Sequence, residues 1–300
     1  MTYDEIVLKY QEKEGKEFSQ RELASALGWS AATVNQVASG KYPNAGQKLA
    51  EMAEKLLGVK EQKAIWSPIV IRPDVIIPTN DLARIFSLAN GLLDVNSSIT
   101  SSIGLITGEA GRGKTTAVKK FACESLNTAY ILYMGYTKGQ LFKEIAETLV
   151  GRSTGSYYNN LKLITAATQV CRKLIIIDEA DRMPLSLLED VRTLNESGLV
   201  PILLVGEPSL AKLTKRADRI DSRIRKPRIE MESLNATTLS TLYKESTGLI
   251  LEPDVIKELL VLCDRDFRRA VNDMQNLVGK LNIIQHRELT KEVIRAYKQQ

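Results

Sequence analysis

The sequence is poor in the residues that build metal centres and disulfide frameworks. Its 300 residues include three cysteines, Cys123, Cys171 and Cys263, and one histidine, His286. The cysteines lie far apart and none belongs to a CxxC pair, so we expect neither a zinc site nor a disulfide framework. We interpret all three as buried small apolar residues, and the histidine as a surface residue.

Long apolar runs are also missing. The most apolar stretches, residues 174–177 and 201–206, have the length of a strand and are too short to cross a bilayer. Residues 1–17 are charged throughout and contain no apolar signal-peptide segment. We therefore expect a cytoplasmic protein with no membrane partner.

Composition leaves the partner open. The chain is 44% hydrophobic and 26% charged, which is ordinary for a globular protein, and its length suggests two or so domains. A net charge of +5 permits an acidic partner such as nucleic acid but does not demand one. The motifs therefore carry the functional argument.

The apolar patterns divide the chain into four parts. Residues 1–60 have helical patterns, 61–80 form a proline-broken linker, 81–232 alternate between strand and helix, and 233–300 return to helical patterns. The alternating part predicts an α/β core with a parallel sheet covered by helices on both faces, followed by a small helical domain. The expected strands are 103–107, 129–134, 173–178, 201–206 and 228–231.

The linker contains prolines that forbid a continuous helix, yet it is too apolar for a free tether. Its apolar residues are Trp66, Ile69, Val70, Ile71, Val75 and Ile76. We expect its later part to pack onto the next domain.

A phosphate-binding loop follows the first expected strand. Residues 108–115 read GEAGRGKT and fit the pattern G-x-x-x-x-G-K-[ST], with a helix expected from Lys114. Glycines let the loop turn its amides inward, and the helix start adds its dipole. Lys114 is expected to reach the terminal phosphates and Thr115 to offer its hydroxyl to Mg²⁺. The nucleotide-binding residues predicted here are Gly108, Glu109, Ala110, Gly111, Arg112, Gly113, Lys114, Thr115 and Thr116.

A second acidic motif follows a buried strand. The stretch KLIIIDEAD, residues 173–181, places Asp178 at the carboxyl end of an apolar strand, where α/β sheets bind ligands. We expect Asp178 to hold Mg²⁺ through water and Glu179 to orient the attacking water. The letters DEAD also occur in DEAD-box helicases, but the chain lacks that family's other motifs and a second α/β domain. An N-K-x-D motif is missing too, which favours ATP over GTP.

These motifs resemble those of the AAA+ ATPases over about residues 81–285. The strand ILLVGEP, residues 202–208, lies where that family keeps its sensor 1 strand. The resemblance implies that Arg223, in RIDSRIRKPRI, is an arginine finger supplied to a neighbouring subunit, with Arg225 as a nearby competitor. It also implies that Arg268, in RDFRRAVNDM, is the sensor 2 arginine of a helical lid, with Arg269 as its competitor.

One position departs from the family pattern. Sensor 1 is usually Asn, Thr, Ser or His, whereas Glu207 follows the strand here. An acid beside the γ-phosphate is electrostatically unfavourable. We expect either that Glu207 points away or that hydrolysis is slow.

Residues 20–40 fit a helix-turn-helix. Ala24 is the small residue expected where the helices touch, Gly28 opens the turn, and Val34 and Val37 anchor the second helix. The residues expected to contact DNA are Thr33, Asn35 and Gln36 in the major groove and Lys41 near phosphate. A helical bundle that contacts protein is the alternative.

A helix-turn-helix followed by an AAA+ module resembles the phage Mu B type of transposition target-selection ATPase. The resemblance implies a bacterial, phage or mobile-element protein that binds double-stranded DNA with little sequence preference when it holds ATP. It further implies a homo-oligomeric helical filament on the DNA and delivery of that target to a transposase, with hydrolysis releasing it. Basic residues of the core, with Lys138, Arg152 and Lys162 as candidates, would then follow the DNA backbone.

Two other functions remain open from the sequence. A helicase loader or replication initiator ATPase would carry nearly the same motifs. A transcription regulator would use the helix-turn-helix to read an operator, with nucleotide as a ligand rather than a fuel. Sequence-tolerant, salt-sensitive DNA binding would favour the transposition reading, and a single palindromic site would favour the regulator.

Overall fold

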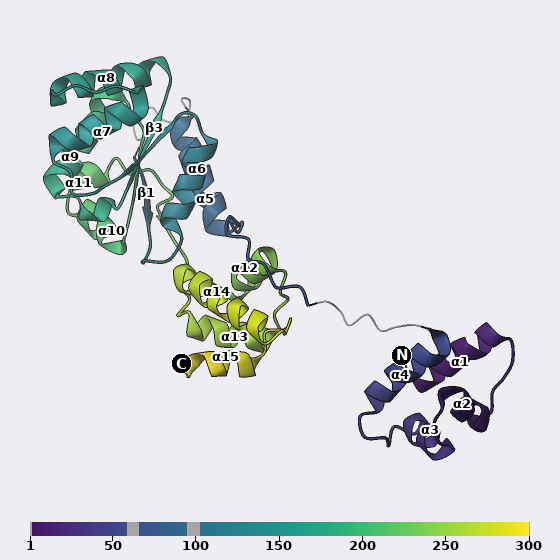
Figure 1. Cartoon of the computed structure of the whole chain (residues 1–300). Coiled ribbons are helices and arrows are strands. Elements are labelled where there is room, and N and C mark those ends of the chain that lie inside the picture. The colour runs from purple at the N-terminus through teal and green to yellow at the C-terminus, as the bar shows by residue number, and fades with distance from the viewer. Residues whose placement is uncertain (1, 59–65, 95–102, 300) are drawn as a thin grey trace. The chain divides into compact units, whose positions relative to one another are not determined.

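The computed structural model describes residues 2–58, 66–94 and 103–299 (Figure 1). The chain divides into two compact units, Met1–Ser67 and Pro68–Gln300. Residues 61–65 of the predicted linker lie outside the described residues. The four-part division of the chain stays a prediction.

The first unit is a small helical bundle with sharply defined helix ends. Capping boxes at Thr2 and Ser19 start the first two helices, and Gly15 and Gly28 end them in the left-handed conformation. The helices are α1 (Tyr3–Glu14), α2 (Gln20–Leu27), α3 (Ala31–Ala38) and α4 (Ala45–Leu57). Their core is built from Ile6, Leu23, Ala24, Leu27, Val34, Met52, Ala53 and Leu56.

The second unit is built on a parallel sheet. Within the described residues it has five strands in the order β2-β3-β4-β1-β5. The strands are β1 (Ile103–Thr107), β2 (Thr128–Leu132), β3 (Leu174–Asp178), β4 (Ile202–Gly206) and β5 (Ile229–Glu230). The inner strands β1, β3 and β4 are buried along their whole length, which explains their continuous apolar sequences.

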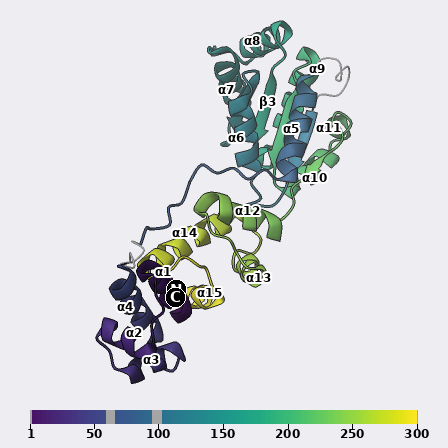
Figure 2. The ribbon, with the colours of Figure 1, turned by 90° about the vertical axis from the view of Figure 1, so that its right-hand side faces the viewer.

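Helices cover both faces of the sheet (Figures 1 and 2). On one face lie α5 (Asn80–Leu93) and α6 (Lys114–Glu124). On the other lie α7 (Lys138–Val150), α8 (Tyr157–Val170), α9 (Leu185–Gly198), α10 (Pro208–Lys215) and α11 (Asp218–Asp221). The predicted α/β fold is confirmed. Helix α5, however, was not predicted from the sequence.

The C-terminal helices form a third hydrophobic core. They are α12 (Ala236–Thr247), α13 (Pro253–Leu262), α14 (Phe267–Ile283) and α15 (Lys291–Lys298). We call residues 233–299 the lid. No helix among the described residues is long and apolar enough to cross a membrane.

The later part of the predicted linker packs against the lid rather than against the sheet. The amide and carbonyl of Ile69 bond with the side chain of Asn282, and the Arg72 amide donates to Ser246 at 2.8 Å. Val70 and Ile76 are 73% and 40% exposed, so only part of this apolar segment is packed. An extended segment turns successive side chains to opposite sides, and here only one side meets the lid.

Candidate nucleotide-binding site

The glycine-rich loop joins the end of β1 to the start of α6. Gly111 and Gly113 have φ of 72° and 87°, a conformation that other residues adopt only with strain. Residues 114–117 begin α6 directly after this turn. The free amides and dipole of the helix start therefore face the loop, which is a favourable place for an anion.

Lys114 lies against the loop that precedes it. Its Nζ donates to the carbonyl oxygens of Gly108 at 2.6 Å and Glu109 at 2.8 Å. Burial lowers the pKa of the Lys114 ammonium, and the carboxylates of Glu207 and Asp178 oppose that shift. The lysine is thus positioned at the loop, among acidic side chains that favour its charged form.

Asp178 and Thr115 come together beneath the loop. The Thr115 hydroxyl donates to Asp178 Oδ2 at 2.7 Å, and the Glu179 amide donates to Oδ1 at 2.9 Å. Asp178 is only 1% exposed. A hydroxyl and a carboxylate in contact offer the hard oxygen ligands that Mg²⁺ prefers, so the residues present fit this cation.

The other two acids of the site lie at the ends of β3 and β4. Glu179 has a φ of 58°, an unfavourable conformation for a non-glycine residue that is common at functional sites. The Glu207 amide donates to Asp181 Oδ1 at 2.9 Å. Glu179 and Glu207 both line the pocket beside the loop. The Glu207 carboxylate is close enough to act on Lys114, which disfavours the expectation that it points away.

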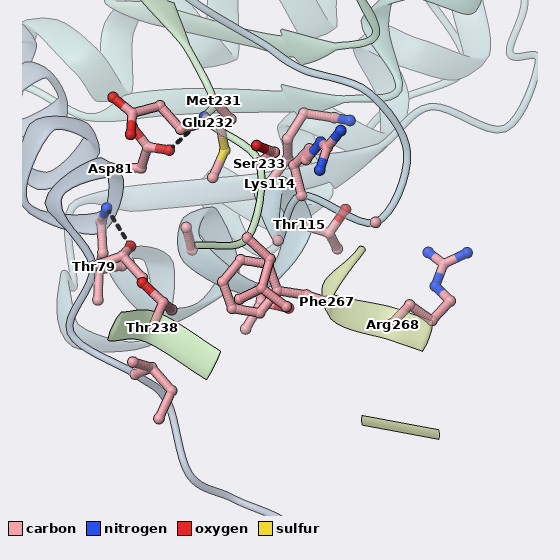
Figure 3. A pocket seen from close by; sticks show the side chains of 18 of the residues that line it. Thr79, Asp81, Lys114, Thr115, Met231, Glu232, Ser233, Thr238, Phe267 and Arg268 are labelled. Carbon is pink, nitrogen blue, oxygen red and sulfur yellow. Dashed lines mark hydrogen bonds between the residues drawn. The ribbon is translucent and has the colours of Figure 1, made fainter. Parts of the chain in front are cut away.

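That pocket has a volume of about 600 Å³ and lies between the loop, the lid and the segment before α5 (Figure 3). Residues 110–116 line one wall, and Phe267 and Arg268 of α14 line another. Arg268 is exposed at its rim. Residues 110–116 of the predicted loop and the sensor 2 candidate therefore meet at one pocket, whereas Gly108 and Glu109 do not line it.

The remaining wall was missed by the sequence analysis. It is formed by residues 75–77, 79–82 and 231–235, which contribute apolar side chains and an equal share of polar ones. Buried Asp81 joins these two segments, because its Oδ2 accepts from the Glu232 amide at 2.8 Å and its Oδ1 from Arg84 (Figure 3). The N-cap pattern at Thr79 before an apolar helical repeat was the available signal.

The lid touches the glycine-rich loop directly. The Phe267 amide donates to the Gly111 carbonyl at 2.9 Å, and Arg112 Nη1 donates to the Arg265 carbonyl at 2.5 Å. Arg265 and its neighbour Asp264 both have positive φ, which turns this carbonyl toward the loop segment. The turn before α14 is thus shaped to fit the loop.

The two candidate finger arginines have different surroundings. Arg223 forms an ion pair with Glu196 of α9, and its side chain is 37% exposed. Arg225 Nη1 donates to the Gly91 carbonyl of α5 at 2.6 Å, and its own amide donates to Ile103. Arg225 therefore holds α5 and β1 together, while Arg223 lies at the surface, away from the pocket lining.

The basic candidates of the core separate into two environments. Lys138 pairs with Asp190 at 2.5 Å and lies over the Tyr157 ring. Arg152 and Lys162 instead line a shallow hollow of about 490 Å³ at the α7–α8 turn. The structure therefore brings Arg152 and Lys162 together. Lys138 lies apart from them, and Asp190 balances its charge.

In the first unit, the predicted helix-turn-helix residues lie on or near α3. Thr33 is bonded to Ser30 in the helix cap, with the two hydroxyl oxygens 2.9 Å apart. Asn35, Gln36 and Lys41 are exposed. Ala24, Val34 and Val37 are buried, as a helix-turn-helix requires.

The sheet order, the glycine-rich loop and the helical lid define an AAA+ P-loop fold. A family model described as an AAA domain matches residues 98–214. The resemblance to the phage Mu B type is also confirmed by curated relatives. The chain is 25% identical over 194 residues to the Mu-like prophage FluMu DNA transposition protein B of Haemophilus influenzae, which covers 63% of this chain and 64% of that protein. It is 24% identical over 199 residues to the ATP-dependent target DNA activator B of Escherichia phage Mu, covering 64% and 60%.

The matches thus span less than two thirds of the length of these relatives. Solved structures with the same fold include the Aeropyrum pernix ORC2 protein in ADPNP–ADP complexes, with a TM-score of 0.57 and 15% identity over 79% of this chain and 71% of that one. The Thermotoga maritima RuvB Holliday junction branch migration motor has a TM-score of 0.51 and 18% identity over 73% and 68%. These likenesses show the fold alone.

Proposed function

We propose that this chain is an ATPase that binds ATP with Mg²⁺ in the 600 Å³ pocket. The observation that carries the proposal is the contact of Thr115 with Asp178 directly under a glycine-rich loop that ends in Lys114. The loop amides and the start of α6 bind phosphate oxygens, and Lys114 neutralises the terminal phosphates. The apolar side chains among residues 75–82 and 231–235 take the base.

Hydrolysis needs a water in line with the γ-phosphate. Glu179, which lines the pocket directly after Asp178, orients and polarises that water. Mg²⁺ held by Thr115 and Asp178 would withdraw charge from the phosphates when bound. Glu207 places a further negative charge near Lys114 where the family has a neutral residue, so the unstimulated reaction is slow.

We further propose that ATP controls binding to duplex DNA in transposition. The support is the pair of relatives named for DNA transposition and for ATP-dependent activation of target DNA. ATP-bound chains assemble as a helical filament on DNA of any sequence and present it to a transposase. Hydrolysis, stimulated by DNA or by the transposase, then releases the DNA.

The DNA contacts are assigned to exposed polar and basic side chains in both units. Arg152 and Lys162 share one hollow and can bind neighbouring phosphates. Asn35, Gln36 and Lys41 lie exposed on or after α3, the recognition helix of a helix-turn-helix. Lys138 contributes less, because Asp190 already balances its charge.

Assembly couples neighbouring sites through Arg223. Its guanidinium is held at the surface by Glu196 and can reach a second subunit, where it stabilises the charge of the transferring phosphoryl group. Arg268 at the pocket rim links the nucleotide to the lid within the same chain.

A Lys114→Ala variant tests the first step of this proposal. It should lose ATP binding and, with it, all ATP-dependent DNA binding, while its DNA binding without nucleotide stays unchanged. Filaments that still form on DNA in an ATP-dependent way would contradict the proposal. A single tight palindromic site would instead favour a transcription regulator, and loading of a replicative helicase would favour an initiator ATPase.

A further inference from the structure

Tyr130 contacts the centre of the candidate magnesium site from outside both nucleotide-binding motifs. Its hydroxyl donates to Asp178 Oδ2 at 2.9 Å. The same oxygen accepts from the Thr115 hydroxyl at 2.7 Å. A residue on β2 is therefore bonded directly to the carboxylate on β3 that is assigned to the metal.

The sheet register explains why a tyrosine at this position reaches Asp178. Tyr130 pairs with Ile176 in the parallel β2–β3 ladder, two residues before Asp178. Residues two apart lie on the same face of a strand, about 6.6 Å apart. A tyrosine side chain that leans along the strand covers that distance and brings its hydroxyl to the carboxylate, on the face covered by α6.

Asp178 depends strongly on such donors. It is 1% exposed, and a buried carboxylate is costly unless hydrogen bonds replace its hydration. The Glu179 amide binds Oδ1, while Thr115 and Tyr130 bind Oδ2. The Thr115 oxygen is itself assigned to Mg²⁺. Of the two side chains that donate to Oδ2, Tyr130 is the one that is not assigned to the metal.

The Tyr130 ring is packed between the sheet and the helices that cover it. These helices are α5 and α6, and Lys119 Nζ lies 5.3 Å from the ring centroid.

We propose that Tyr130 is a positioning residue for the Mg²⁺ site, fixing the Asp178 carboxylate in the orientation in which it also accepts from Thr115. The proposal rests on the proposed binding of ATP with Mg²⁺ at this site. In this role Tyr130 affects the Mg²⁺ concentration that ATP binding requires, and it does not affect the nucleotide pocket itself.

The test compares Tyr130→Phe with the wild-type full chain. A fluorescent ATP analogue is bound first in EDTA and then at rising MgCl₂ concentrations. In EDTA the variant should bind like the wild type, which also shows that it is folded. The Mg²⁺ concentration at the midpoint should rise about fivefold, because one hydrogen bond that orients the carboxylate is lost.

Tyr133→Phe is the matched control. Tyr133 directly follows β2, is 4% exposed, and donates its hydroxyl to the Tyr136 carbonyl at 3.2 Å, a bond that does not involve Asp178. It should leave the Mg²⁺ midpoint unchanged. A Tyr130→Phe midpoint equal to the wild type, or equal losses with and without Mg²⁺, would overturn the proposal while leaving the ATPase assignment intact. A wild-type chain that binds no ATP would overturn both.

Discussion

Asp266, at the start of the lid helix α14, lies directly against Gly111 of the glycine-rich loop. A Cβ built on Gly111 would fall 1.8 Å from Asp266 Oδ2, which is an impossible contact. The same carboxylate caps α14 by accepting from the Arg269 amide at 3.0 Å. Glycine at 111 is thus needed both for the backbone turn and for the close approach of the lid.

Gly111→Ala should therefore weaken ATP binding by about tenfold or more. An alanine at a φ of 72° is strained by about 1–2 kcal/mol, and its methyl group must also displace the cap of α14. Titration with a fluorescent ATP analogue measures the effect. Gly139→Ala, at an open position in α7, is the control and should bind normally. Normal binding by Gly111→Ala would show that the lid contact is not required.

The contact between Arg112 and the Arg265 carbonyl holds the lid to the loop. In Arg112→Ala the amide of Phe267, which donates to Gly111, should exchange with solvent about fivefold faster. Hydrogen exchange resolved at the start of α14 measures this. Arg269→Ala removes a surface arginine that pairs with Asp264 at 3.4 Å, and it should leave the exchange rate unchanged. Equal protection in both variants would refute the role of Arg112.

Periodicity and motif spacing predict the strands and most helices closely. The expected strand 103–107 is β1, and the expected helix 138–150 is α7. These elements have continuous apolar runs or a clear apolar stripe, so local sequence decides them. Helix α5 was missed although its signals are local: Thr79 caps it, and Ile85, Leu88 and Leu92 recur at helical spacing.

The site could be predicted only where a motif carries it. Lys114, Thr115 and Asp178 meet because the carboxyl ends of parallel strands share one edge of the sheet. Tyr130 and Asp81 follow no motif, since their roles depend on sheet register and on contacts between distant segments. The sequence likewise does not distinguish Arg223 from Arg225, whose surroundings differ in the structure.

Substitution of Arg225 should affect stability, whereas substitution of Arg223 should affect ATP hydrolysis. Arg225→Ala removes a bond to the Gly91 carbonyl and should lower the free energy of unfolding by about 1–3 kcal/mol. Arg223→Ala removes an exposed ion pair and should change stability by less than about 1 kcal/mol. It should instead lower DNA-stimulated ATP hydrolysis by at least about tenfold. Thermal unfolding and phosphate release distinguish the two, and full activity of Arg223→Ala would exclude it as the finger.

Acid should destabilise the first unit through Glu51. Hydrogen bonds from Lys48 and Lys55 lower the pKa of this carboxyl to about 2, from 4.5. A carboxyl with a lowered folded pKa stabilises the fold above its unfolded pKa, and this contribution is lost as pH falls from about 4.5 to about 2. The side chain is 37% exposed, so the loss should stay under about 1 kcal/mol.

Trp29 donates to Glu51 and reports on this change. Thermal unfolding is followed by Trp29 fluorescence in a Trp66→Phe background, from about pH 6 down to about pH 2. Glu51→Gln should remove this part of the pH dependence, whereas Glu54→Gln, at an exposed position on the same helix, should retain it. An unchanged pH profile in Glu51→Gln would contradict the assignment.

The central claim is that ATP controls assembly of this chain on DNA without regard to sequence. The most direct measurement is binding to several unrelated duplexes with ADP, ATP and a non-hydrolysable analogue, with negative-stain microscopy of the same samples. Our account predicts filaments on every duplex with ATP and with the analogue, and none with ADP. Nucleotide-independent binding at one sequence, with no filaments, would contradict it.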